Sequence, residues 1–186
     1  MANKSKDKGD RYERAAVKYI IETVPELVDA KLPMRMLGAG RLEDIGDLSL
    51  FTDAAIQVKA VSNMGQAVRS SVEGSVIQAA NAKVEFALGM VPVQGARKTQ
   101  VNWLAATAVD RWPEPVEHVA EFALISKALT WLRDDTGPYG YRVWPRSERI
   151  CLLTGPGTPC LVAPFTAWTD AFARARAART GLLAAA

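Results

Sequence analysis

Four polar residues in the first third of the chain are of types that can hydrolyse a phosphodiester bond. They are Glu13 in a segment with helical periodicity, Asp47 at the start of an expected strand, and Gln57 and Lys59 on the next expected strand. Because successive side chains of a strand point to opposite faces, Gln57 and Lys59 share one face. An acid, an oxygen ligand and an ammonium would then converge at one sheet edge. Hydrolysis with a hard cation and a bound water needs such a set.

The composition indicates a folded globular domain with a buried core. The chain has 186 residues, of which 49% are hydrophobic and 23% charged. The net charge of +3 is on its own only a weak indication of an acidic partner. Its distribution says more, because residues 1–18 carry a surplus of three positive charges. The basic residues there are Lys4, Lys6, Lys8, Arg11, Arg14 and Lys18, against Asp7, Asp10 and Glu13.

The scarcity of cysteine and histidine argues against zinc chemistry. The chain has only Cys151, Cys160 and His118, and structural zinc needs about four such ligands. A disulfide between Cys151 and Cys160 is geometrically possible across a hairpin, but two scattered thiols are more typical of a reduced, cytoplasmic protein. The charged N-terminus has no apolar signal region, and no run of about 18 apolar residues predicts a membrane span.

Residues 9–24 have the periodicity of an amphipathic helix. Its polar stripe comprises Arg11, Arg14, Lys18 and Glu22, and its apolar arc comprises Tyr12, Ala16, Val17, Ile20 and Val24. Glu13 falls inside the apolar arc, where an unpaired charge is costly to bury. Two interpretations are open: a first-turn acid favoured by the helix dipole, or a carboxylate aimed at a cation on the neighbouring sheet.

The remaining segments alternate between strands and helices. After a loose basic arm at residues 1–8 and the first helix, we expect strands at 33–38, 47–51 and 54–61 and a helix, weakened near Gly74, at 66–88. Strands follow at 90–94 and 100–107, then a helix at 115–134, strands at 141–145, 149–154 and 160–164, and a helix at 165–179. This order predicts an α/β domain with a mixed sheet flanked by helices.

Residues 108–186 are expected to form an α+β extension packed on the core at 1–107, either continuing the sheet or covering one edge. The five tryptophans are predicted to lie in the core or an interface, and His118 at the surface. Arg174, Arg176 and Arg179 are interpreted as solvated cations, because cations favour a helix C-terminus.

Several motifs together resemble a known nuclease group. They are Lys8-Gly9-Asp10-Arg11-Tyr12-Glu13-Arg14 opening the first helix, Gly46-Asp47-Leu48, Gln57-Val58-Lys59, and Ala79-Ala80-Asn81-Ala82 with the strand and basic loop that follow. Over roughly residues 4–107 the chain resembles the PD-(D/E)XK, or restriction-endonuclease-like, superfamily. Within it, the chain is most similar to Holliday junction resolvases of the archaeal and phage kind. The resemblance implies a restriction-endonuclease-like core, and a location in the cytoplasm of a bacterial or phage-infected cell.

The resemblance implies a set of magnesium ligands. Asp47 matches the metal-binding acid, although Gly46 stands where proline is common. Gln57 matches the (D/E) position, where its amide oxygen can bind Mg²⁺ but brings no charge. The backbone carbonyl of Val58 is a further implied ligand, and Mn²⁺ can substitute for Mg²⁺.

The missing negative charge could come from Glu13, Asp44 or Asp53. Glu13 is the best of these, since its helix is expected beside the active edge. Lys59 matches the lysine that orients or deprotonates the attacking water and offsets charge on the phosphate. The implied reaction is metal-assisted in-line attack on phosphorus.

DNA is the implied partner. Phosphate contacts are predicted for Lys4, Lys6, Lys8 and Arg11 on the N-terminal segment and for Arg97 and Lys98 on the basic loop. The resemblance also implies a homodimer, because two-fold symmetry suits two symmetric cuts in a four-way junction.

Competing interpretations remain open for the sequence. Asp47 can be an ordinary polar residue at a strand start, and Gln57 and Lys59 the solvated face of an edge strand. The leading hypothesis is an endodeoxyribonuclease for branched DNA. The alternatives are a restriction- or repair-type nuclease acting on duplex DNA, and a non-cleaving DNA-binding protein whose site has decayed at Gln57.

Overall fold

The computed structural model describes residues 4–29, 34–35, 47–94, 101–117, 119–133 and 149–184. Its helices are α1 (Lys4–Thr23), α2 (Met64–Ala82), α3 (Ile125–Leu132) and α4 (Phe165–Ala184), with short 3-10 turns η1 (Pro25–Leu27) and η2 (Val109–Arg111). Its strands are β1 (Met34–Arg35), β2 (Leu48–Ser49), β3 (Ala54–Val58), β4 (Phe86–Gln94), β5 (Val101–Ala108), β6 (Ala120–Phe122), β7 (Cys151–Leu153) and β8 (Cys160–Pro164).

The described strands form one mixed, open sheet in the order β1-β2-β3-β4-β5-β8-β7-β6. The β3–β4 and β6–β7 pairs are parallel, and the other neighbours are antiparallel. Helix α2 makes the crossover that a parallel β3–β4 pair requires. Strand β8 pairs with β5, so the described strands after residue 108 continue the sheet instead of only covering an edge. The predicted α/β class is confirmed.

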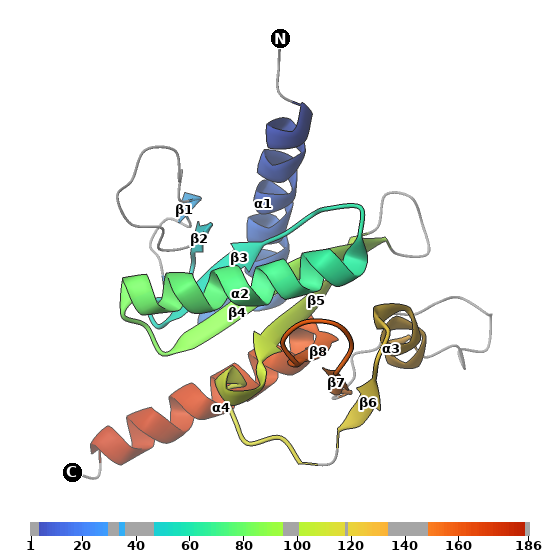
Figure 1. The fold of residues 1–186 in the computed structure, drawn as a ribbon. Coiled ribbons are helices and arrows are strands. Elements are labelled where there is room, and N and C mark those ends of the chain that lie inside the picture. The colour runs from blue at the N-terminus through green and yellow to red at the C-terminus, as the bar shows by residue number, and fades with distance from the viewer. Residues whose placement is uncertain are drawn as a thin grey trace, which may run out of the picture.

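Helices cover both faces of the sheet. Figure 1 shows α2 crossing the near face of the sheet, and α1 and α4 behind it. Alternation along β5 assigns the faces: Trp103 and Ala105 pack with the core of α1 and α4, whereas Leu104 and Ala106 pack with α2 and α3. Among the tryptophans, Trp103, Trp112 and Trp168 are buried, as predicted, and Trp144 lies outside the described residues.

Helix α2 ends six residues earlier than the sequence pattern predicts. Lys83 adopts a left-handed conformation (φ 54°) and its N–H donates to the carbonyls of Ala79 and Ala80, which closes the helix after Ala82. Strand β4 then begins at Phe86, so the expected strand at 90–94 starts four residues sooner. The apolar residues 86–88 belong to the sheet because they pair in register with β3.

Three other expected elements differ from the structure. The helix predicted at 115–134 is instead β6 followed by α3, because residues 120–122 pair in parallel with β7. Residues 4–8 belong to α1 and are not a loose arm. Strand β3 ends at Val58 and not at 61. The strand predicted at 141–145 lies outside the described residues.

Helix α4 is tied to the core by arginines that the sequence suggested were solvated. Arg176 donates to the carboxylates of Asp29 and Asp53 and to the carbonyl of Leu27. The flanking Arg179 pairs with Glu85 at 2.6 Å, and Arg174 with Glu114 at 2.8 Å. Helix α4 continues to Ala184, so these arginines precede its last turn. Their acidic partners therefore hold them in place, and the helix terminus does not.

The carboxylates of Asp29 and Asp53 serve this connection. Desolvation opposes ionisation of Asp29, but hydrogen bonds from Arg176 and Thr52 outweigh it and lower its pKa. Asp53 was one candidate source of the missing negative charge at the predicted site. Its ion pair with Arg176, at 3.0 Å, instead gives it a structural role.

Candidate active site

Glu13, Asp47, Gln57 and Lys59 line the same cavity. It has a volume of about 430 Å³, and its lining residues are Gly9, Glu13, Asp47, Gln57, Val58, Lys59, Ala60, Val61 and Ser62. The cavity lies where the start of α1 meets the beginning of β2 and the end of β3. Residues separated by up to 46 positions are therefore neighbours, as the strand alternation and the apolar-arc position of Glu13 led us to expect.

Asp47 is fixed against β3 through both backbone and side chain. Its N–H donates to the carbonyl of Ile56 at 2.9 Å. Its Oδ2 accepts the backbone N–H of Val58 at 2.7 Å and the Nε2 of Gln57. Asp47 is half-buried. These contacts differ from those expected of a solvated polar residue at a strand start.

Gln57 is buried between β3 and α2, with 4% of its surface exposed. Its Oε1 accepts a hydrogen bond from Nε2 of Gln78 at 2.7 Å. Strand β3 lies between β2 and β4. The interpretation of Gln57 as part of a solvated edge strand is therefore wrong. The amide nitrogen faces Asp47 and the oxygen faces Gln78, which is the reverse of the expected ligand orientation.

Glycine in α2 makes room for this side chain. A Cβ at Gly74 would lie 2.6 Å from Oε1 of Gln57 and 3.1 Å from its Cγ. The sequence suggested that Gly74 weakens the helix, but α2 runs through it without a break. Gly74 and Gln78 are one turn apart and therefore share a helix face. This face is unusually polar for a buried surface, since Ser71 and Ser75 also lie on α2 and are fully buried.

Glu13 and Lys59 line the cavity from two different elements of the fold. Helix α1 is anchored by Ala16 and Ile20, both with no exposed surface, which leaves Glu13 half-buried at the cavity. Lys59 follows the end of β3, and its N–H still donates to the carbonyl of Met90 on β4 at 3.0 Å. Both residues therefore line the cavity without belonging to the same element.

The donor atoms of the cavity fit a hard divalent cation. Carboxylate, amide and backbone carbonyl oxygens are the ligands of Mg²⁺, and soft donors do not line the cavity. Within the part of the chain that the structure describes, no group of three His, Cys, Asp or Glu side chains could hold a metal ion. The cavity thus offers two carboxylates, Glu13 and Asp47. Mg²⁺ sites commonly use one or two carboxylates, with waters and substrate phosphates completing the shell.

The residues predicted to contact phosphate lie partly within and partly outside the described structure. Asp44, Gly46, Arg97 and Lys98 lie outside the described residues, as does His118. Lys4, Lys6 and Lys8 are in α1. Arg11 is exposed, with its guanidinium 5.3 Å from the centroid of the Tyr12 ring. The phosphate contacts predicted for these residues stay predictions.

Sequence reasoning missed Gly74 and Gln78. Both lie on a helix that was expected to pack on the sheet, and a glutamine on its inner face was the available signal. Without a template for the packing, the sequence does not show which strand residue this glutamine meets.

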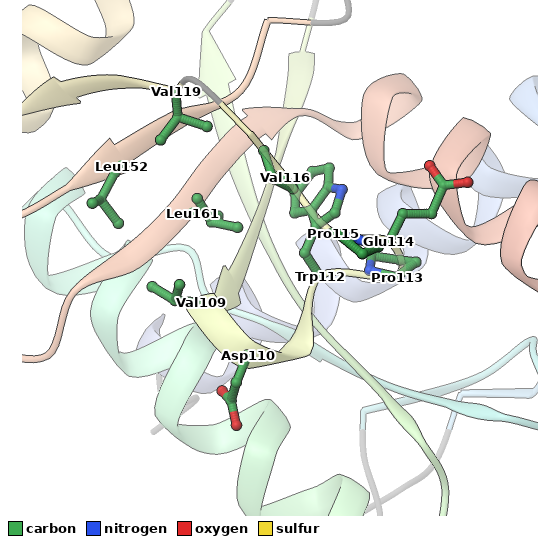
Figure 2. A pocket seen from close by; sticks show the side chains of 10 residues that line it. All are labelled: Val109, Asp110, Trp112, Pro113, Glu114, Pro115, Val116, Val119, Leu152 and Leu161. Atoms are coloured by element: carbon green, nitrogen blue, oxygen red, sulfur yellow. The ribbon is translucent and has the colours of Figure 1, made fainter.

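A second cavity has a different character. It has a volume of about 360 Å³, and its lining residues are Val109, Asp110, Trp112, Pro113, Glu114, Pro115, Val116, Val119, Leu152 and Leu161. In Figure 2 the carboxylates of Asp110 and Glu114 point away from each other. Glu114 is already paired with Arg174. Among the described lining residues, these two carboxylates therefore do not converge as phosphodiester chemistry would require.

The two cysteines are free thiols on neighbouring strands. Cys151 is opposite Val162 and Cys160 opposite Leu153, so they are not direct cross-strand partners. Burial raises the pKa of Cys151 to about 12, with a smaller contribution from Cys160. Burial also raises the pKa of Cys160 to about 11, against the opposing effect of Arg69. Both are protonated at neutral pH, which is unsuited to nucleophilic or metal-ligand roles.

Comparison with models of protein families, with curated proteins and with solved structures finds no match for this chain. Among the described residues, no helix combines the length and apolar character that crossing a bilayer requires.

Proposed function

We propose that this protein is a Mg²⁺-dependent endodeoxyribonuclease that hydrolyses phosphodiester bonds in branched DNA, as Holliday junction resolvases do. The observation that carries the proposal is the meeting of Glu13, Asp47, Gln57 and Lys59 in one cavity. The order of the first elements, one helix, three strands, a crossover helix and a parallel strand, is compatible with the resemblance of the sequence motifs to PD-(D/E)XK nucleases.

The residues of the cavity divide the chemistry between them. Asp47 and Glu13 would hold the cation, and the Gln57 amide and the Val58 carbonyl would be neutral oxygen donors. The bound cation supplies Lewis acidity and a water of lowered pKa. Lys59 orients that water and offsets the negative charge that builds on the phosphate. The described lining residues contribute two carboxylates, so waters and a DNA phosphate would complete the coordination shell.

Two alternatives each have one observation in their favour. A restriction- or repair-type nuclease acting on duplex DNA is favoured by the C-terminal strands, which enlarge the sheet beyond the part that resembles resolvases. A non-cleaving DNA-binding protein is favoured by the neutral Gln57 and by the lack of a three-carboxylate cluster among the described residues. Homodimer formation and a cytoplasmic location belong to the proposal as implications of the resemblance.

Cleavage of a synthetic four-way junction in Mg²⁺ or Mn²⁺ tests the proposal. Asp47→Ala and Lys59→Ala should each lower the cleavage rate by at least about 100-fold, the usual scale for losing one charged catalytic group, while junction binding persists. Matched controls are Asp110→Ala, whose side chain is 79% exposed, and Lys127→Ala on the exposed side of α3. Equal cleavage by the Asp47 and control variants would refute the assigned roles.

A comparison of substrates separates the alternatives. Junction, fork, linear duplex and single strand of the same sequence are incubated under identical conditions. Preferred cutting of the junction supports the resolvase function, whereas equal cutting of linear duplex at one sequence supports the restriction- or repair-type alternative. Tight binding of DNA with no cleavage in either metal supports the non-cleaving alternative.

A further inference from the structure

Two buried glutamines connect helix α2 to the candidate site. Gln57 is 4% exposed and Gln78 is 1% exposed. Nε2 of Gln78 donates to Oε1 of Gln57 at 2.7 Å, and Nε2 of Gln57 donates to Oδ2 of Asp47. The hydrogen bonds therefore all run in one direction, from the helix through β3 to the carboxylate.

This direction conflicts with cation binding. An amide has a donor end and an acceptor end, and only its oxygen can bind a metal ion. In the structure the donor end of Gln57 faces Asp47, where it partly offsets the negative charge. A cation that recruits Asp47 and Gln57 together must displace this NH₂ group and bring the oxygen to the same place.

The neighbouring amide allows a reversal that keeps the hydrogen bond between the two side chains. If Gln57 turns by about half a revolution around its last side-chain bond, its NH₂ group faces Gln78. Gln78 can turn in the same way and present its oxygen, so the hydrogen bond between the two glutamines is kept. Rotation about this type of bond has a broad, roughly two-fold profile, so neither amide is forced into a strained rotamer.

We propose that Gln57 and Gln78 form a paired amide switch that couples the side chain at position 57 to cation binding. This inference depends on the proposed function, because it assumes that the cavity binds a divalent cation. In the cation-free orientation Gln78 is the donor and Gln57 contacts Asp47. In the cation-bound orientation Gln57 directs its oxygen into the cavity and Gln78 is the acceptor. Gln78 is a positioning residue, since it acts through Gln57.

The switch explains why a glutamine can stand at this position. A glutamate at position 57 has two equivalent oxygens and needs no turn, but it would repel Asp47 in the absence of a cation. With glutamine, the cation-free site is neutralised by the amide, and the cation must compete with a hydrogen bond. A weak site that fills at high Mg²⁺ concentration, and to which a DNA phosphate adds affinity, follows from this arrangement.

Nuclear magnetic resonance of the wild-type protein tests the switch without any variant. The side-chain NH₂ signals of Gln57 and Gln78 are followed during titration with Mg²⁺, and the backbone N–H of Val58, which donates to Asp47 at 2.7 Å, reports on occupation of the site. We expect all three signals to shift with one common midpoint. A shift of Val58 with both NH₂ signals unmoved would overturn the switch alone. No shift in any of the three up to high Mg²⁺ would overturn the proposed metal site and the switch together.

A double-mutant cycle measures the coupling directly. Gln78→Glu leaves only an acceptor when ionised, so at a pH at which nuclear magnetic resonance shows the variant's carboxyl to be ionised it should favour the cation-bound orientation and tighten binding of Mn²⁺. Part of that gain is simple charge attraction, and the same substitution combined with Gln57→Leu measures this part, because leucine has no amide to turn. The gain should be about fivefold larger with glutamine at position 57, which is the equilibrium effect of one ordinary hydrogen bond. Equal gains in the two backgrounds would contradict the switch.

Discussion

Replacement of Gly74 by alanine tests the packing on which the candidate site depends. In a helix interior this change normally stabilises a protein by roughly 0.5–1 kcal/mol, because it reduces the entropy of the unfolded chain. At Gly74 the new methyl group would be 2.6 Å from Oε1 of Gln57 and 3.2 Å from its Cδ. The amide must move, so the substitution has opposite effects on helix propensity and on the site.

The magnitude follows from the contacts that are lost. Moving the amide breaks the hydrogen bond from Gln78 or the one to Asp47. Leaving a buried polar group without a partner costs about 1–3 kcal/mol. The gain in helix propensity offsets part of this cost. We therefore expect the free energy of unfolding to fall by between about zero and about 2 kcal/mol. Affinity for Mn²⁺ should fall by about 5- to 30-fold, because the displaced amide no longer reaches the cation.

Gly181→Ala on α4 is the matched control. A Cβ at Gly181 has no neighbouring atom within 4 Å, so only the propensity gain remains. Urea unfolding gives the stability of each variant, and electron paramagnetic resonance of free Mn²⁺ gives its affinity. If Gly74→Ala stabilised the protein as much as Gly181→Ala and left Mn²⁺ binding unchanged, Gln57 would not pack against α2 as described.

Three further predictions concern stability and reactivity. Lys83→Gly should raise the free energy of unfolding by about 0.5–1 kcal/mol in urea, because glycine adopts φ 54° without a steric cost; unchanged stability would contradict this. Arg176→Met should lower the free energy of unfolding by about 2–3 kcal/mol, because hydrogen bonds between charged groups are lost. The pKa of Asp29 is lowered in the folded state, so its contribution is present above its ordinary value of 3.8 and is lost as the pH falls through the lowered pKa. The variant should therefore lose less stability than the wild type in this acid range. Cys151 and Cys160 should resist alkylation at pH 8 until the protein unfolds, which mass spectrometry can follow, because both thiols are buried and their pKa values are raised to about 12 and about 11.

The sequence predicted which residues meet in the cavity better than it predicted the packing around them. Strand alternation separated Gln57 from its neighbours in sequence, and in the structure Ile56 and Val58 pack in the core of α1 and α4 whereas Gln57 contacts α2. The apolar-arc position of Glu13 left two interpretations open: the first-turn acid is wrong because α1 begins at Lys4, and Glu13 instead lines the cavity beside β3. These inferences succeeded because they depend on local geometry, which the periodicity of the sequence determines.

The failures all involve contacts between distant residues. The amphipathic pattern at 115–134 resembled one helix, but pairing of Ala120 with Cys151, 31 residues later, makes part of it a strand. Arg176 looked solvated until its partners, Asp29 and Asp53, were brought to it from more than 120 positions away. Local propensity is a weak guide where tertiary pairing opposes it.

Helix α4 also determines when during synthesis the site can form. Phe172 stacks on Trp168, with ring centroids 4.7 Å apart, and contacts Phe51 and Phe86 on either side of β3, each at 5.1 Å. Until these residues leave the ribosome, the hydrophobic surface beneath β3 is uncovered and α1 lacks its neighbour on that face. A nascent chain that already contains Glu13, Asp47, Gln57 and Lys59 therefore lacks the packing that supports the candidate site until α4 has been translated.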